Sequence, residues 1–449
     1  MKHPPLIFGT ITGALALSAS LLFLTNTAAG TDRQDSSTDG EDFDRTIIQY
    51  NAHLLRTGRQ AFRFETLGDE AFWGDALKLH QAIAGAANGG VGGGLSPQAA
   101  LSLGLKVDRE ALPSSLQKQL RQGKVNLADP ATTLALLKLD AVVGVKGFFE
   151  GGRLRSVGIQ CSLCHSTVDN SFAPGIGARL DGWPNRDLNV GAIIALAPEL
   201  SPFTNALGVD AATVRAVLQS WGPGKFDAAL MLDGKAFRPD GKSGATLIPA
   251  AFGLAGVNLH TYTGWGSVTH WNALVGNLEM GGQGTFYDPR LADADKFPIA
   301  AKAGSFYVRH DPDLVTPKLA ALHAYQLAIP APNPPRGSYN AGSAKRGRTV
   351  FNGKAQCASC HVPPLFTDPG WNMHTPAEIG IDDFQAKRSP DEHYRTTPLQ
   401  GLFTREKGGF YHDGRFASYL AVVNHYDNHM NLLLSEAEKN DLVEYLKSL

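Results

Sequence analysis

Two pentapeptides, Cys161-Ser162-Leu163-Cys164-His165 and Cys357-Ala358-Ser359-Cys360-His361, contain all four cysteines of this 449-residue chain. A c-type haem is attached through two thiols that add across its vinyl groups, and the histidine after the second thiol ligates the iron. Each pentapeptide supplies that set. The sequence therefore predicts two covalently bound haem c groups, with His165 and His361 as the proximal iron ligands.

Other uses of these cysteines fit the pattern less well. A zinc ribbon places its two C-x-x-C pairs roughly 15–20 residues apart, whereas the second pair here begins 196 residues after the first (357 − 161). A thioredoxin-like motif would lie near a βαβ pattern in a reducing compartment, and this sequence meets neither condition. Disulfides would leave both following histidines unexplained.

The first thirty residues indicate the compartment. Lys2 and His3 precede an uncharged, mostly apolar run from Leu6 to Leu24, and Thr27-Ala28-Ala29 offers small residues at a cleavage site. This order predicts a secretory signal peptide over residues 1–29 and a periplasmic mature chain. Because the run approaches the length of a spanning helix, an uncleaved N-terminal membrane anchor is the alternative. The Asp/Ser/Thr/Gly-rich stretch that follows predicts a flexible tether over residues 30–45.

Charge and length restrict the binding partners and the number of domains that this chain can have. Removing residues 1–29 deletes one Lys from the 41 basic residues and leaves 42 acidic ones, so the mature net charge is −2 (40 − 42). This balance predicts no nucleic-acid partner and no binding to an anionic membrane surface. About 420 residues suffice for two domains with buried cores.

A proline-rich stretch beginning at Ile329 divides the chain, because prolines at this density exclude a helix or a central strand. We expect a linker over residues 329–342, an N-terminal haem domain over 46–328 and a C-terminal cytochrome c-like haem domain over 343–449. The predicted fold class is mainly α, with two cytochrome c-like haem domains, extensive loops and an extended N-terminal domain.

Local signals add detail to this division. Ser343 is expected to cap a helix that leads to Cys357, and Ser435-x-x-Glu438 is a capping box that begins a terminal helix. Residues 46–82 and 201–221 have helical spacing. The Gly/Pro-punctuated residues 225–283 predict loops and turns over the first haem.

The segments Tyr394-Arg395-Thr396-Thr397-Pro398-Leu399 and Tyr411-His412-Asp413-Gly414-Arg415 follow the second haem motif. They resemble the R-T-P-x-L and H-D-G-R segments of the bacterial dihaem cytochrome c peroxidase and MauG superfamily. The resemblance implies one c-type haem in each of two mostly helical domains. It also implies that Arg395, His412 and Arg415 contact the cofactor, with His412 as a structural or propionate contact.

The resemblance also implies where a sixth ligand of the second iron would lie, fourteen residues after the histidine of H-D-G-R. That position holds Tyr426, a hard anionic donor that stabilises ferric iron. Met430 lies one helical turn further on and is the main alternative. His425 and Met373 are further candidates.

At the first haem the resemblance implies a distal carboxylate that moves protons. Within residues 269–283, Glu279 and Gln283 are the candidates, one turn apart if that segment is helical. His270 is a candidate distal ligand or hydrogen-bonding group. Trp271 is the first choice for a relay of oxidising equivalents between the haems, ahead of two other tryptophans near this segment, Trp183 and Trp265.

Three functions follow from these residues. The leading interpretation is a peroxidase, in which one haem reacts with hydrogen peroxide and the other receives electrons from a small periplasmic carrier, a cytochrome c or a cupredoxin. The rival enzyme, favoured by Tyr426 in place of methionine, uses peroxide or dioxygen to oxidise a protein side chain or an organic substrate. The third interpretation is a dihaem electron carrier without catalysis.

Overall fold

A computed structural model describes residues 37–449, so the predicted signal peptide lies outside the described residues. Helix α1 (Ser37–Phe64) begins inside the expected tether, and the prediction of an unstructured tether is therefore wrong for residues 37–45. The acidic and hydroxyl residues that suggested a tether are also those favoured at the start of a helix. Among the described residues, no helix combines the length and the apolar character that crossing a membrane requires.

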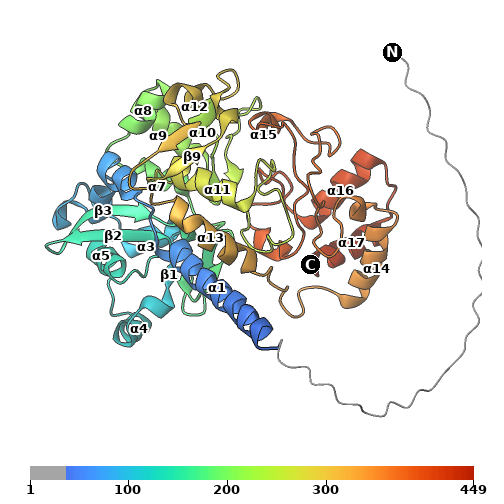
Figure 1. The fold of residues 1–449 in the computed structure, drawn as a ribbon, viewed down its shortest axis with the longest axis horizontal. Helices are drawn as coiled ribbons and strands as arrows, with labels where there is room; N and C mark the ends of the chain where they lie inside the picture. The colour runs from blue at the N-terminus through green and yellow to red at the C-terminus, as the bar shows by residue number, and fades with distance from the viewer. Residues whose placement is uncertain (1–36) are drawn as a thin grey trace, which may run out of the picture. The chain divides into compact units, whose positions relative to one another are not determined.

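Helices dominate the structure, as the sequence predicts (Figure 1). After α1 the α-helices are α2 (Leu79–Ala84), α3 (Pro97–Ser102), α4 (Ser114–Arg121), α5 (Pro130–Lys138), α6 (Ser162–His165), α7 (Val190–Ala195), α8 (Ser201–Leu207), α9 (Ala211–Ser220), α10 (Leu230–Asp233), α11 (Val268–Leu274), α12 (Pro298–Ala303), α13 (Thr316–Ala328), α14 (Ala341–Asn352), α15 (Phe384–Lys387), α16 (Tyr419–Met430) and α17 (Glu436–Lys447). The helical elements of residues 37–449 also include two π-helices, η1 (Ala71–Ala76) and η4 (Val275–Glu279), and five 3₁₀ turns, η2 (Ala86–Asn88), η3 (Arg109–Ala111), η5 (Pro289–Ala292), η6 (Cys357–Ser359) and η7 (Leu402–Arg405).

The strands of the described residues form only two-stranded sheets. The antiparallel pairs are β2 (Val145–Glu150) with β3 (Arg153–Ile159), β4 (Ser166–Val168) with β6 (Arg179–Asp181), β7 (Lys225–Phe226) with β8 (Thr246–Leu247), and β9 (Thr285–Tyr287) with β10 (Tyr307–Arg309); β1 (Val107–Asp108) pairs in parallel with β5 (Ile176–Gly177). These ladders are too small to organise a core by themselves. Helix packing therefore sets the architecture.

The largest apolar core lies in the N-terminal part and includes buried residues of α2, α5, α7 and α9 together with Leu163 of the first cysteine motif. A second core joins α14, α16 and α17 through buried side chains such as Phe351, Leu442 and Tyr445. Figure 1 shows these three helices grouped together, in orange to red. The capping box of Ser435 and Glu438 is present at the start of α17.

Several predicted boundaries shift. The cap of α14 is Asn340, whose side chain accepts a hydrogen bond from the Ser343 amide, so Ser343 lies inside the helix. Residues 225–283 are not all loop, because Ser267 caps α11 and the helix buries Val268 and Leu274. Residues 329–335 contain neither helix nor strand. All residues from Tyr50 to Leu449 nevertheless form one compact unit.

A buried ion-pair cluster connects the two halves of this unit. Arg388, directly after α15, is completely buried and lies 2.9 Å from Asp227 and 2.7 Å from Asp233 at the end of α10. It also donates to the Gly244 carbonyl at 3.1 Å. A buried arginine is tolerated only when its charge and donors are satisfied in this way.

We expect Asp233→Ala to lower the free energy of unfolding by about 3–5 kcal/mol, because it leaves part of a buried guanidinium charge uncompensated. Asp240→Ala is the matched control, since Asp240 is partly exposed and its ion pairs lie at the surface; its cost should stay below about 1 kcal/mol. Urea denaturation of both holoproteins measures the difference. Equal losses in the two variants would contradict a buried role for the cluster.

Candidate functional site

The first cysteine motif is positioned by the strand before it. Cys161 lies two residues after the end of β3, and α6 then carries Cys164 and His165. The turn packs closely on the preceding β-hairpin segment. A Cβ atom at Gly144, which has φ +78°, would come within 2.2 Å of the Leu163 backbone. This close approach requires glycine at position 144.

Both motif histidines are oriented by a backbone carbonyl. The Nδ1 atom of His165 lies 3.2 Å from the Pro249 oxygen, and that of His361 lies 3.0 Å from the Phe366 oxygen. Burial lowers the pKa of each imidazole to about 4, which keeps it neutral. A neutral imidazole that donates through Nδ1 presents the Nε2 lone pair to a metal.

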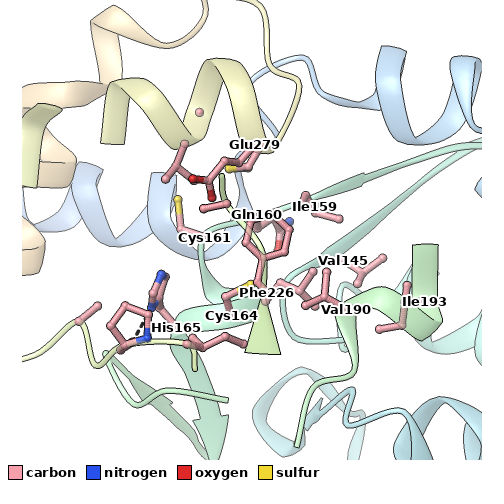
Figure 2. Close-up of a pocket in the computed structure, with 18 of the residues that line it drawn as sticks. Val145, Ile159, Gln160, Cys161, Cys164, His165, Val190, Ile193, Phe226 and Glu279 are labelled. Carbon is pink, nitrogen blue, oxygen red and sulfur yellow. Dashed lines mark hydrogen bonds between the residues drawn. The ribbon is translucent and has the colours of Figure 1, made fainter. Parts of the chain in front are cut away.

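Each cysteine motif lines its own cavity. Cys161, Cys164 and His165 line the first, with a volume of about 310 Å³, and the second motif lines another of about 240 Å³. Figure 2 shows the first motif in its cavity, with Glu279 near Cys161. Most lining side chains of both cavities are aliphatic or aromatic. Two largely apolar cavities of this kind suit two large, mostly apolar cofactors.

The two cavities share part of their walls, so neither belongs to one half of the chain alone. The residues that line both are Pro249, Ala250, Leu254, Thr261, Tyr262 and Arg395. Gln385 and Arg388 from the C-terminal half also line the first cavity, and Arg186 from the N-terminal half lines the second. Each half of the chain therefore completes the cavity of the other.

Glu279 is the acidic residue that lines the first cavity. It ends the π-helix η4, and no described residue hydrogen-bonds its carboxyl group. Burial raises its pKa to about 8, with a smaller contribution from the Asp227 charge. At neutral pH this carboxyl group therefore holds a proton inside the cavity.

Two of the other predicted distal residues lie outside the cavity lining. Gln283 follows η4 in a loop. Its backbone N–H donates to the Leu67 carbonyl, and its backbone carbonyl accepts from the Leu314 N–H, so it is not one helical turn from Glu279. His270 points its Nε2 atom towards Asp288 at 3.7 Å. Gln283 lies away from the cavity because the helix ends after Glu279. His270 lies away from it because its ring is oriented towards the Asp288 carboxylate. Neither placement supports a role at the first haem.

The predicted tryptophans separate in the same way. Trp271 and Trp265 line the first cavity only, with ring centroids 5.5 Å apart. Trp183 packs on Phe403 and lines neither cavity. The aromatic residue in the shared wall is Tyr262. The structure therefore does not place Trp271 between the cavities.

His260, which sequence reasoning missed, also lines the first cavity. Its Nε2 atom lies 3.0 Å from the Val257 oxygen, its Nδ1 atom has no partner among the described residues, and burial lowers its pKa to about 4. It lies in an irregular loop between β8 and α11. No spacing or motif in the sequence marks it, and only the fold brings it to the cavity.

Tyr426 of α16 lines the second cavity, and burial raises its pKa. Met430 lines it as well, at the end of the same helix, and is 44% exposed. His425 does not line it, because its Nε2 atom lies 2.8 Å from the Ile379 oxygen. Met373 lies against Gly264, outside the lining. Tyr426 and Met430 are therefore the candidates that face this cavity.

The residues of the H-D-G-R segment divide between the cavity and its support. His412 lines the second cavity and stacks on Tyr394, with ring centroids 5.1 Å apart. Burial lowers its pKa to about 4. Arg415 does not line the cavity, since it pairs with Asp413 at 2.9 Å and with Asp382. Arg415 therefore supports the turn around His412 and makes no contact with the cavity.

Comparison with known proteins finds relatives that are similar to part of this chain. No family profile matches the sequence. The methylamine utilization protein MauG of Methylorubrum extorquens is 30% identical over 154 residues, and that of Methylophilus methylotrophus is 28% identical over 127 residues. These matches cover 29% and 24% of this chain, and the chain spans 43% and 36% of the two relatives. Over these stretches the chain is similar to two proteins named MauG, in line with its resemblance to the dihaem cytochrome c peroxidase and MauG superfamily.

Two solved structures are similar at a low level. Hydrazine synthase of Kuenenia stuttgartiensis has a TM-score of 0.28 and 19% identity, over 48% of this chain and 76% of that chain. A MauG-like protein associated with microbial copper homeostasis has a TM-score of 0.32 and 16% identity, over 49% and 76%. Similarity at this level carries no argument about the site.

Haem is the cofactor that the superfamily implies, and buried cations of this chain fit it. Arg395 in the shared wall and Arg186 and Arg405 in the second cavity each carry guanidinium nitrogens without a partner among the described residues. Burial lowers the pKa of Arg395 and of Arg405 to about 10. Haem propionates are carboxylates that would satisfy such donors. The sequence predicts Arg395 at the cofactor, whereas Arg186 and Arg405 carry no recognisable signal.

If each motif attaches one haem, removing the cysteines of one motif should remove one haem and leave the other. Cys161→Ser with Cys164→Ser should remove one covalent haem, and the same change at Cys357 and Cys360 should remove the other, because a hydroxyl group does not add across a vinyl group under these conditions. Haem staining and mass spectrometry measure the number attached. A variant that keeps two haems per chain would exclude this assignment.

Ligation by Tyr426 predicts a spectral change in one haem only. Tyr426→Phe removes the phenolic oxygen and keeps the ring, so the packing of α16 should survive. The absorption spectrum and potential of the second haem should change, while those of the first stay the same. Met430→Leu is the matched control on the same helix. If only Met430→Leu alters the second haem, methionine is the ligand.

Proposed function

We propose that this protein is a periplasmic dihaem c-type oxidoreductase that reduces hydrogen peroxide at its first haem. A small electron carrier, a cytochrome c or a cupredoxin, would supply electrons through the second haem. The observation that carries the proposal is the carboxyl group of Glu279, which faces the first cavity without a hydrogen-bond partner. Among the described residues, none that lines the second cavity is acidic.

Haem iron, when bound, would accept an oxygen ligand and exchange electrons with it. The chain supplies the rest of the first site. His165 presents Nε2 from one side, held by the Pro249 carbonyl. Trp265, Trp271 and Met280 line the cavity with mostly apolar surface. In a mostly apolar site, proton transfer depends on a positioned group.

Glu279 is suited to hold and deliver a proton there. Because its pKa is about 8, the carboxyl group is protonated at neutral pH and can donate to the leaving oxygen of a peroxide. It is free to turn, since no described residue fixes it. The same burial would penalise the carboxylate left after donation, which favours rapid reprotonation.

The second cavity is suited to electron transfer. Tyr426 and Met430 both face it, and either would occupy the position that a substrate needs. His412 and Arg405, whose Nε atom has no partner among the described residues, add polar contacts without a proton donor of suitable pKa. The wall shared by the cavities contains Pro249, whose carbonyl oxygen lies 3.2 Å from Nδ1 of His165, so the first motif contacts a residue that also lines the second cavity.

A second function is favoured by one observation. Tyr426, rather than a methionine, lies at the expected ligand position and lines the second cavity. A phenolate ligand lowers the potential of a haem and stabilises its oxidised forms. This would suit MauG-like or oxygenase-like oxidation of a protein side chain or an organic substrate. Peroxide consumption that depends on such a substrate, and not on a reduced carrier, would select this alternative.

Glu279→Gln should lower the rate of peroxide reduction by roughly 10²–10⁴-fold, because it keeps the shape of the side chain but removes the transferable proton. In the wild type the rate should fall as pH rises through about 8, where Glu279 loses its proton. The variant should lack that pH dependence. Stopped-flow mixing of reduced holoprotein with peroxide measures both effects.

Glu150→Gln is the control for this experiment, since Glu150 lies on the surface at the end of β2. It should react like the wild type. A Glu279→Gln variant with the wild-type rate and pH profile would exclude Glu279 as the proton donor. A wild-type protein that binds neither peroxide nor carbon monoxide in any oxidation state would exclude the peroxidase and favour an electron carrier.

A further inference from the structure

Three neighbouring side chains in the wall of the first cavity each have one buried polar atom without a partner among the described residues. The atoms are Nδ1 of His260, Oγ1 of Thr261 and Nη1 of Arg395. All three residues line the first cavity, and Thr261 and Arg395 also line the second. His260 is only 6% exposed. Buried polar atoms in folded proteins are nearly always hydrogen-bonded, so three neighbouring exceptions indicate a binding site.

Hydrogen bonds hold these three residues next to one another. The Nε atom of Arg395 donates to the Thr261 carbonyl at 2.8 Å, and the Arg395 backbone N–H donates to the Tyr262 carbonyl at 2.8 Å. His260 directly precedes Thr261, and its carbonyl accepts a hydrogen bond from the Trp271 indole at 3.2 Å. The three unpartnered atoms therefore belong to adjacent residues whose backbones are fixed.

The backbone of Thr261 is strained. Its φ angle is +66°, a value that a β-branched residue rarely adopts. Residues 260–266 and residues 410–416 are each closed by an antiparallel bridge between their first and last residues, and the second residue of the latter turn, Tyr411, has a φ angle of +67°. Tyr411 lines the second cavity. Each half of the chain thus places a strained residue in a cavity wall, and such strain clusters at functional sites.

The donors and acceptors of the three side chains restrict the ligand. Nε2 of His260 lies 3.0 Å from the Val257 oxygen and carries the hydrogen of that contact, so Nδ1 presents a lone pair. Arg395 presents a charged N–H group, and the Thr261 hydroxyl can donate. A carboxyl group matches this set, because its oxygens accept from Arg395 and Thr261 while one proton lies between it and His260.

We propose that His260, Thr261 and Arg395 bind one propionate group of the first haem and that His260 shares a proton with it. The first haem is the one concerned because His260 lines the first cavity only. The inference rests on the proposed function for the presence of the haem. When this haem gains one electron from the carrier, the pair gains one proton from solvent, since the lower positive charge of the iron favours the protonated form.

The charges around His260 determine where this proton exchange occurs. Arg395 and His323 of α13 are the charged or titratable groups that act on His260, and Arg405 and Tyr262 act in turn on Arg395. Burial, together with the Arg395 charge, lowers the pKa of His260 to about 4. A carboxylate beside Nδ1 raises this pKa, because an opposite charge favours the imidazolium. The potential of the first haem should therefore fall as pH rises above about 4.

Optical redox titration of the holoprotein from about pH 5 to about pH 8 tests the proposal. One proton per electron gives a fall of up to about 59 mV for each tenfold change in proton concentration. His260→Phe keeps a ring without nitrogen, so this slope should disappear while both haems stay attached. His260→Asn is a second variant if the first folds poorly; it offers an amide that does not titrate, and it should also lose the slope.

His53→Phe is the matched control, since His53 is exposed on α1. It should keep the wild-type slope. A redox-difference infrared spectrum should also contain a carboxyl band that moves in the His260 variants and stays in place in His53→Phe. This band distinguishes a propionate group from bound water, which has no carboxyl stretch.

The outcomes are separable from those of the proposed function. A slope that the His260 variants lose and His53→Phe keeps supports the proposal. A wild-type potential that does not depend on pH, or a slope that the His260 variants retain, overturns it and leaves a site that holds only water. Peroxide reduction is measured separately. A protein that reduces peroxide but shows no such slope retains its proposed function and loses only this proton site.

Discussion

The hydrogen bond between His165 and the Pro249 carbonyl links the first cysteine motif to the wall that both cavities share. It aims Nε2 of the first motif into its cavity and fixes the tautomer that can ligate iron. Pro249 also lines the second cavity, so the same bond ties the first motif to the wall between the sites. A change in the loop that follows β8 would therefore disturb both cavities together.

The electrostatic difference between the cavities follows from which charged groups are left uncompensated. In the first, a carboxyl group stays protonated because burial penalises its charge. In the shared wall and the second cavity, guanidinium groups stay charged while one or two nitrogens of each have no partner among the described residues, which is costly unless an anion binds there. Arg388 differs from these arginines, because two aspartates compensate its charge and the resulting ion pairs stabilise the fold. Unsatisfied and satisfied buried charges thus distinguish sites for a cofactor from structural anchors.

The two halves of the chain depend on one another more than the proline-rich linker suggests. Prolines prevent a helix across residues 329–335, but they do not prevent the domains from packing. Arg395 and Gln385 reach the first cavity from the C-terminal half, and Arg186 reaches the second from the N-terminal half. Cavities built from both halves would hold two cofactors at a fixed separation, which would suit electron transfer between them.

The sequence by itself predicts the chemistry of attachment, because two thiols and a histidine at fixed spacing have few other uses and local spacing needs no tertiary contact. It also determined the helical character, the start of α17 at its capping box, and Tyr426 and Glu279 as residues that face the cavities. Only the tertiary structure decided that His260, Arg186 and Arg405 line the cavities and that His270 and Gln283 do not. These outcomes depend on how the loops pack and on which neighbouring groups bind each side chain. Neither can be read from a residue's position along the chain.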